Sequence, residues 1–427
     1  MFTLQTFRCG LGAVLAAAWL WASPAPVAAD VLGVEAAVAR ALAANPGLAA
    51  LRSRAAALAA RPVREGALPE PRLMVNLVNL PLNEPDPGAT PMTQLQAGIS
   101  QVLPYPGKRS LKQAAAEQEA AAAREEVAEE RLQLARAVRR SWWEAFYLQR
   151  TLEVLRRNDT LLGQFVDIAR AKYEVGQGLL QDLSLAEVER AKLREWQLRV
   201  QGAQAAARVR LNTLLDRPAT TALALPGEVD TTLAPAPSFE VLLVAAERLR
   251  PVLHARRHQV DAAQRRLELA RKEYYPDFQI AALYGAREGR SDMGSVLFSM
   301  NLPLRTGTRQ DPLREQRGLE LRHSQQQLAA RRARVAGDIA TALARYRQAR
   351  AQVLEFTGTL LPQARQTVES MLAAYQVNKV DFLNLVRAQI TVYDYETRHW
   401  QAFAEARQAQ ADLAAATGKE TVDELFQ

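Results

Sequence analysis

The sequence predicts a mainly helical protein with a small β part, in which one helix–strand–strand–helix plan occurs twice. Two observations carry this prediction. First, landmark residues recur in the second half of the chain at a nearly constant separation in sequence. Second, each copy holds two short segments in which apolar and polar residues alternate, beside long stretches of helix-forming residues. We expect residues 30–218 to form the first structural repeat, 219–238 a linker, and 239–427 the second repeat.

The lag between the two copies is close to 200 residues. Four landmarks return in the same order: Pro46 as Pro251, Pro71 as Pro276, Pro104 as Pro303 and Tyr173 as Tyr375. Their lags are 205 (251 − 46), 205 (276 − 71), 199 (303 − 104) and 202 (375 − 173) residues. Landmarks that return in order at one lag indicate a tandem duplication.

Residues 1–29 have the composition of a cleavable secretory signal. Arg8 is the only charge, an apolar stretch follows it, and Val27-Ala28-Ala29 supplies small residues at the cleavage positions. An uncleaved anchor is the alternative. Cys9 lies inside this segment rather than at its end, so we do not expect lipidation. The exported chain would have no cysteine, and therefore no disulfide and no thiolate metal site.

Beyond residue 30, no apolar stretch is long enough to cross a bilayer as a helix. A protein of this kind would enter a membrane only through strands. The net charge of +8 is spread along the helices without a basic tail. Because an exported protein meets no nucleic acid, acidic lipid headgroups are the expected partner of this charge.

Two long helices are predicted in each copy. No proline occurs between Pro106 and Pro218, and Gly107 to about Lys172 is rich in strong helix formers, which predicts a rod on the order of 95 Å. The other rods span about 179–214, 310–375 and 381–416. Pro362 is expected to kink its helix, and Asn158 and Gly163 to bend theirs. Alanine-lined faces favour a bundle or closed helical barrel over a dimeric coiled coil.

Four segments alternate as strands do: about 72–80, 93–103, 277–286 and 293–303. The apolar faces comprise Leu95, Ala97 and Ile99, then Phe278, Ile280, Ala282 and Tyr284, then Val296, Phe298, Met300 and Leu302. Their lengths of about 9 to 11 residues suit a tilted strand that crosses a bilayer. Four strands cannot close a barrel, and lipid excludes open edges, so several chains would have to pool their strands. The alternative is a small soluble sheet.

Three local patterns, doubled and in order, resemble the TolC-type outer-membrane efflux family over essentially the whole exported chain. They are Ile99 to Arg109, where a strand leads into the long helix; Tyr173-x-x-Gly176 followed by Asp182-Leu183 and Ala186-Glu187; and Leu211 to Pro218, with Asp216 where the family usually has Gly. The Pro-Gly-Lys-Arg segment looks most like members that work with heavy-metal pumps of the RND type.

The resemblance implies a homotrimer with two connected parts. A trimeric 12-stranded transmembrane β-barrel, four strands per chain, would sit in the outer membrane and join a long periplasmic α-helical barrel. The tunnel mouth would dock on a periplasmic adaptor (membrane fusion protein) fed by an inner-membrane pump. The pump supplies the energy, so the resemblance implies no enzymatic activity and no cofactor.

The resemblance also assigns adaptor contact and gating to the two helical tips. The residues concerned are Tyr173, Gly176, Asp182, Tyr375, Asn378, Asp381, Asn384 and Arg387. Gly176 and Asn378 are residue types that tolerate the left-handed conformation of a tight turn. Lys108 and Arg109 follow a strand directly and are expected at the membrane rim, where they would reach lipid phosphates or simply solvate the helix entry.

Relatives gate with rings of acidic residues after the second tyrosine, but Asn384 and Arg387 occupy those positions here. Two explanations remain open for how the closed state would be maintained without that acidic ring. Either Asp182 and Asp381 pair with Lys379 and Arg387, or the closed state is held differently.

Other chemistry finds little support in the sequence. His254 and His258 have a metal-compatible spacing on a helix, but no third ligand is apparent, so no metal site is predicted. No nucleophile set or close acid–base pair stands out, and Gly107-Lys108-Arg109-Ser110 is not a phosphate-binding loop because the upstream glycine is missing.

The function expected is therefore a passive export channel of a tripartite efflux system, with an RND pump and with heavy-metal cations as the first candidate cargo. Drug efflux and type I secretion stay open, as do a soluble periplasmic coiled-coil scaffold and an adaptor.

Overall fold

The computed structural model describes residues 31–83, 86, 88, 90–377 and 379–422. The expected signal peptide and Asn378 lie outside the described residues. The first copy contains, in order, α1 (Val34–Ala44), α2 (Pro46–Ala59), α3 (Arg61–Gly66), β1 (Arg72–Val78), β2 (Gln94–Leu103), α4 (Lys108–Glu174) and α5 (Leu180–Leu214).

The second copy repeats this order. It contains α6 (Phe239–Leu249), α7 (Pro251–Lys272), β3 (Phe278–Ala286), β4 (Met293–Met300), the short helix η1 (Thr306–Thr308), α8 (Gln310–Glu355), η2 (Phe356–Leu360), α9 (Leu361–Gln376) and α10 (Phe382–Thr417). The predicted fold class, mainly α with four strands, is confirmed. Two strands are shorter than predicted: β1 has 7 residues and β4 has 8.

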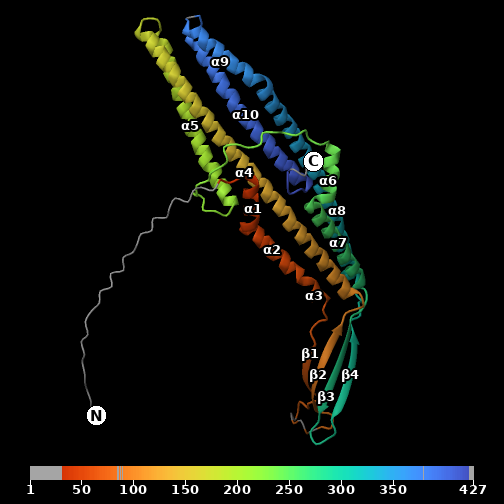
Figure 1. Cartoon of the computed structure of the whole chain (residues 1–427). Coiled ribbons are helices and arrows are strands. Elements are labelled where there is room, and N and C mark those ends of the chain that lie inside the picture. Colours follow the sequence, from red (N-terminus) through yellow and green to blue (C-terminus); the bar gives the residue numbers. More distant parts are fainter. Residues whose placement is uncertain (1–30, 84–85, 87, 89, 378, 423–427) are drawn as a thin grey trace, which may run out of the picture.

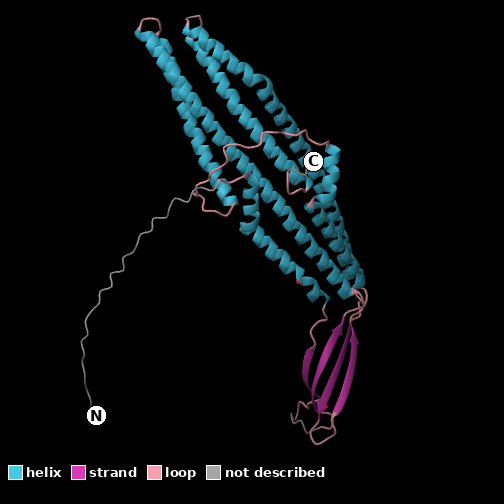
Figure 2. Cartoon of the chain, viewed as in Figure 1, coloured by secondary structure: helices cyan, strands magenta, loops and turns pink. Residues whose placement is uncertain are grey.

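The molecule is an elongated helical bundle with the sheet at one end and two helical hairpins at the other (Figures 1 and 2). The four strands form one antiparallel sheet in the order β1-β2-β3-β4. The central pair, β2 and β3, therefore joins the two repeats. Within the described residues, no helix is long and apolar enough to cross a membrane.

Helix α4 runs unbroken for 67 residues, so the interruption expected at Asn158 is absent. The Asn158 side chain is buried: its Nδ2 donates to the carbonyl of Val154 at 2.8 Å, and its Oδ1 accepts from Gln389 Nε2 at 2.5 Å. The buried amide is therefore satisfied without disturbing the helix. Pro362, in contrast, stands at the start of α9 directly after a five-residue π-helix, and the rod bends there (Figure 1). The missing amide hydrogen of proline explains the local change in helical pitch.

Equivalent helices of the two copies end in the same hydrogen-bond pattern. At the two tips, the amide of Gln177 donates to the carbonyl of Lys172, and that of Lys379 to Ala374, both five residues back and 202 residues apart (379 − 177). The ends of α5 and α10 show the same bond. There, Asp216 at φ 52° and Gly418 at φ 86° occupy equivalent left-handed positions, again 202 apart (418 − 216). Asp216 thus adopts the left-handed conformation that a glycine adopts at the equivalent position of the second repeat.

The core has three parts along the bundle. One joins α4, α5, α9 and α10 near the tips, a second surrounds α1 and the middle of α4, and the third lies between α6, α8 and α10. The linker crosses the outside of the bundle as an extended strap (Figure 1). Arg350 Nε donates to the carbonyl of Leu233 at 2.9 Å, and Arg407 donates to that of Asp230 at 2.6 Å, so the strap is tied to both α8 and α10.

Candidate functional site

The sheet separates apolar from polar side chains between its two faces. Register pairs Leu73, Ile99, Ala282 and Val296 in one row across the four strands. The row beside it holds Val75, Ala97, Tyr284 and Gly294, so the predicted apolar faces of the strands align on one surface. The large apolar side chains of this surface that are exposed range from 42% exposed at Ile280 to 81% at Val296. An apolar surface of this extent marks contact with lipid or protein.

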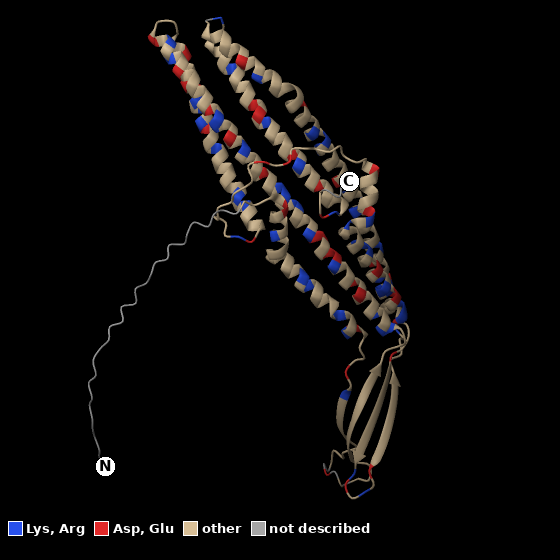
Figure 3. Cartoon of the chain, in the orientation of Figure 1, with Lys and Arg blue, Asp and Glu red and all other residues tan. Residues whose placement is uncertain are grey.

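The opposite face is concave and carries most of the polar side chains of the sheet. Its polar members comprise Arg72, Asn76, Gln94, Gln96, Ser100, Gln279, Ser295 and Ser299. The burial pattern indicates this concavity. Ser100, Ala281 and Leu283 on this face are nearly inaccessible to solvent, whereas the alternate residues along the same strands, on the other face, are exposed. Gly98 lies on it with no room for a side chain, since a Cβ there would come within 2.2 Å of the Ala282 carbonyl. The charges of the molecule are concentrated on the helices (Figure 3).

The two outer strands, β1 and β4, are each paired on one side only. Neither edge is covered by a helix or loop in the arrangement seen in Figure 2. A sheet with two open edges and one exposed apolar face is incomplete as a soluble unit.

The junction between sheet and helices is held by an ion pair. Lys108 is 4% exposed, and its Nζ contacts Asp277 Oδ1 at 2.9 Å and the carbonyl of Tyr275 at 3.0 Å. The prediction that Lys108 reaches lipid phosphates is therefore wrong, because the ammonium group is buried against acceptors of the second repeat. Arg109 also turns inward and donates through Nε and Nη2 to the carbonyl of Gly66 at 2.9 and 2.6 Å. Lys108 thus ties the start of α4 to the segment that enters β3, and Arg109 ties α4 to the end of α3.

The two helical hairpins end in tips that are equivalent in sequence and different in environment. Gly176 has φ 72° and turns the first tip, as predicted. Tyr173 is 45% exposed, whereas its equivalent Tyr375 is 5% exposed and packs against Phe382 with ring centroids 5.3 Å apart. Tyr375 therefore does not offer the contact surface predicted for it. Tyr375 is buried because it packs against residues of the first hairpin.

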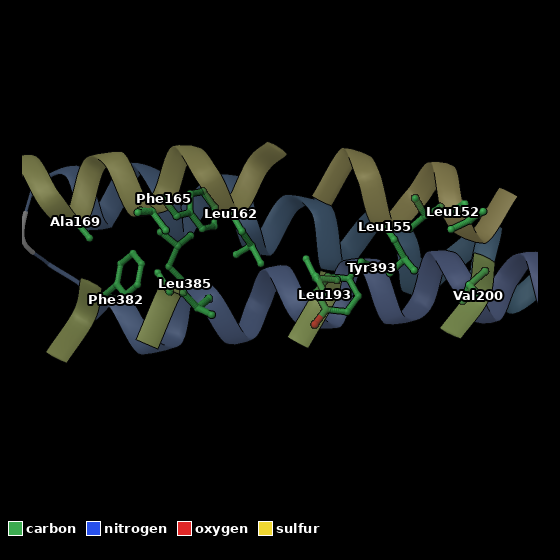
Figure 4. Packing of buried hydrophobic residues seen from close by; sticks show 14 of the residues in the cluster. Leu152, Leu155, Leu162, Phe165, Ala169, Leu193, Val200, Phe382, Leu385 and Tyr393 are labelled. Atoms are coloured by element: carbon green, nitrogen blue, oxygen red, sulfur yellow. The ribbon is translucent and has the colours of Figure 1, made fainter. Parts of the chain in front are cut away.

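One lysine links the hairpins at this level. Lys172 Nζ, on α4, donates to the carbonyl of Tyr375 at 2.6 Å and lies 4.1 Å from the centre of its ring. Below this contact, Phe165, Leu162 and Ala169 of α4 meet Phe382 and Leu385 of α10 in a continuous apolar layer (Figure 4). No local sequence pattern indicates the lysine link, because the two residues are 203 apart.

Asp182 and Asp381 are the acidic groups at the tips that sequence reasoning singled out. Burial raises the pKa of Asp182, and the negative charge of Asp381 raises it further, while the amide hydrogen bond at Leu179 and the charge of Lys172 act in the opposite direction. Among the ion pairs of the described residues, none joins either aspartate to Lys379 or Arg387. Within one chain, therefore, these four residues form no ion pair, and their pairing between chains in the closed state stays a prediction. Asp381, Asn384 and Arg387 are exposed.

Farther from the tips, α4 and α10 are joined by ion pairs that the sequence analysis did not predict. The buried carboxylate of Glu396 accepts from Arg157 of α4 and from Arg365 of α9, the latter at 2.7 Å. Arg136 and Arg140 of α4 share Asp412 of α10 at 2.9 and 2.6 Å. The pairs made by Arg157, Arg136 and Arg140 join residues from different repeats, so sequence spacing carries no signal of them.

The histidine pair is occupied by protein partners. The ring of His254 contacts the carbonyl of Arg248 at 2.8 Å, and that of His258 contacts Gln118 Oε1 at 2.7 Å. Over the described residues, no cluster of three metal-ligating side chains occurs.

Comparison with solved structures identifies the fold. The fold is that of the outer membrane protein VceC from Vibrio cholerae, with 18% identity, a TM-score of 0.77, and 92% of this chain and 97% of that chain covered. The MtrE outer membrane channel of Neisseria gonorrhoeae is similar at 17% identity and a TM-score of 0.76, covering 92% of this chain and 90% of that one. CusC, a transmembrane channel, is similar at 17% identity and a TM-score of 0.78, covering 90% of this chain and 92% of that one. The fold is therefore that of TolC-type outer-membrane channels.

A family model matches the sequence of the second repeat. Residues 242–419 match the family described as "Outer membrane efflux protein". The second repeat is therefore similar in sequence to outer membrane efflux proteins. No curated protein sequence matches the chain.

Proposed function

We propose that three copies of this chain form the outer-membrane channel of a tripartite efflux system. Their sheets would close into a barrel of twelve strands, and their helical hairpins would enclose a tunnel that extends into the periplasm. The single observation that carries this proposal is the exposed apolar face of a sheet with two open edges. Backbone groups at an open edge are not tolerated in lipid, so membrane insertion requires closure.

The strand order is compatible with closure by copies of one chain. Because the order β1-β2-β3-β4 alternates in direction, β4 of one copy can pair antiparallel with β1 of the next. Head-to-tail contacts of this kind form a closed ring when the rotation between copies completes a circle. The concave polar face would then line the lumen, and the apolar convex face would meet the acyl chains.

The partners proposed are a periplasmic adaptor at the tips and an inner-membrane pump behind it. Support comes from the exposed side chains of Tyr173, Asp381, Asn384 and Arg387 at that end of the molecule. Heavy-metal cations, with an RND pump, remain the first candidate cargo from the resemblance of the Pro-Gly-Lys-Arg segment. That assignment rests on sequence likeness alone, with drug efflux and protein secretion beside it.

Two measurements test the proposal. The mass of the assembly extracted in detergent from outer membranes is expected to correspond to three chains; a monomer or dimer in the soluble periplasm would contradict it. A matched pair of labelled variants tests orientation. A fluorophore on Val296→Cys is expected to be quenched by lipid-borne quenchers, and one on the adjacent Ser295→Cys by iodide in water. Equal quenching at both positions would count against a membrane barrel.

A further inference from the structure

Arg72 is the only charged side chain in the four strands. It opens β1 and lies on the concave face, in the row with Ser100, Ala281 and Leu297. The other polar members of this face are uncharged amides and hydroxyls. The concave face therefore combines one positive charge per chain with no negative charge.

The guanidinium group of Arg72 is exposed, and among the described residues it takes part in no ion pair and no hydrogen bond. A neighbouring copy would not neutralise it through strand pairing. The strand that would pair with β1 is β4 of the next copy, and Met293–Met300 contains no acidic residue. The charge is therefore left to act on solutes.

We propose that Arg72 makes the barrel lumen favour anionic and neutral solutes over cations. This inference rests on the proposed trimeric barrel, in which three-fold symmetry places three copies of Arg72 at one height. Three like charges facing an aqueous path that is enclosed by low-dielectric protein set up a positive potential that repels cations and attracts anions. An exported cation would then cross against this field, driven by the pump rather than by the lumen.

Salt screens this potential, and the screening sets the conditions of the test. The Debye length is about 8 Å at physiological ionic strength and about 30 Å near 0.01 M. At low salt it spans a barrel lumen, so the effect of Arg72 on selectivity is expected to be largest there and to fade as salt is raised.

The experiment is the reversal potential of the purified trimer in planar bilayers under a roughly tenfold KCl gradient centred near the low-salt regime. Wild type, Arg72→Gln and Arg72→Glu are compared. Arg54→Gln, the same change at an exposed position on α2 away from the sheet, is the control. The anion-to-cation permeability ratio is expected to fall several-fold in Arg72→Gln and further in Arg72→Glu, with Arg54→Gln unchanged.

Equal reversal potentials in wild type and both Arg72 variants would overturn the role of Arg72 while leaving the channel itself intact. A shift in Arg54→Gln as large as that in Arg72→Gln would also overturn it, since the effect would then reflect net charge. If trimeric wild type conducts no ions at all, the proposed channel fails, and the inference fails with it.

Discussion

At the residue scale, the same residue type has different effects in the two repeats because each copy meets different neighbours. Tyr173 and Tyr375 are equivalent by sequence, yet only Tyr375 is buried and contacted by Lys172. Asp182 lies beside this contact and shares its surroundings with Asp381. The tips therefore combine an attractive link with a repulsive pair of carboxylates.

The raised pKa of Asp182 predicts a pH dependence at the tips. A carboxyl whose pKa is raised in the packed state binds its proton more tightly there than when the hairpins separate, so acid favours packing and this contribution is lost as pH rises through the raised pKa. Spin labels on Gln181→Cys and Gln376→Cys are expected to show a shorter, narrower distance distribution at pH about 4 than at pH about 7. In an Asp182→Asn background this pH response should shrink markedly; an undiminished response would assign it to another group.

The convex face of the sheet makes a second prediction at this scale. Phe298 is 60% exposed there, and an arginine in its place would have to enter the hydrocarbon of the proposed membrane barrel, at a cost of about 2 to 4 kcal/mol near the bilayer centre. Phe298→Arg is expected to reduce the yield of assembled protein in the outer membrane, as is Ile99→Arg. Gln96→Arg, on the concave face, is the matched control and should assemble normally. Normal assembly of all three would argue that the convex face does not meet lipid.

At the element scale, the duplicated plan is visible in how helices end. The long helices of both repeats end with an amide that reaches back five residues, and a left-handed residue follows α5 and α10. Gly418 is required at the end of α10, because a Cβ there would lie 2.7 Å from the carbonyl carbon of Leu249. Asp216 occupies the equivalent position after α5, where the left-handed backbone conformation is strained for a residue that carries a side chain.

Replacing Asp216 by glycine is expected to stabilise the protein. The left-handed conformation costs an ordinary L-residue roughly 1 kcal/mol relative to glycine, and Asp216→Gly removes that cost from the folded state. The melting temperature of the detergent-solubilised protein should rise slightly in Asp216→Gly and fall in Gly418→Ala. A lower melting temperature for Asp216→Gly would show that the aspartate side chain contributes more than its backbone strain costs.

At the scale of the whole molecule, the two repeats are not independent domains. They share one sheet through the β2–β3 pair, and α4 of the first repeat packs against both α7 and α10 of the second. The strap between them is bound to α8 and α10 by backbone acceptors. Either repeat alone would keep only a two-stranded hairpin, and the first repeat alone would also leave a face of α4 uncovered.

Separating the repeats should therefore abolish folding of either half. Residues 1–218, exported alone, are expected to be degraded by periplasmic proteases, because an isolated hairpin is marginal and half of the α4 surface would be bare. Co-expression with an exported fragment of residues 219–427 should restore protease resistance and assembly, as measured by immunoblot of outer-membrane fractions. A protease-resistant single repeat would show that each copy folds by itself.

The sequence by itself determined the duplication, the order of helices and strands, and the face that each strand makes apolar. These follow from local periodicity and from landmarks such as Pro71 and Pro276, which need no knowledge of distant contacts. It also located the tips, because Gly176 marks a turn between long helix-forming runs.

Only the tertiary structure decided what each tip or junction residue contacts. Lys108 was placed at a lipid rim by its neighbours in sequence, but Asp277, 169 residues later, draws it into a buried ion pair. Tyr375 was expected to be exposed, but the first hairpin covers it. Asn158 was expected to disturb α4, but Gln389 satisfies its amide. In each case the partner comes from the other repeat, and the free energy of a contact between residues so far apart in sequence leaves no trace in the local pattern.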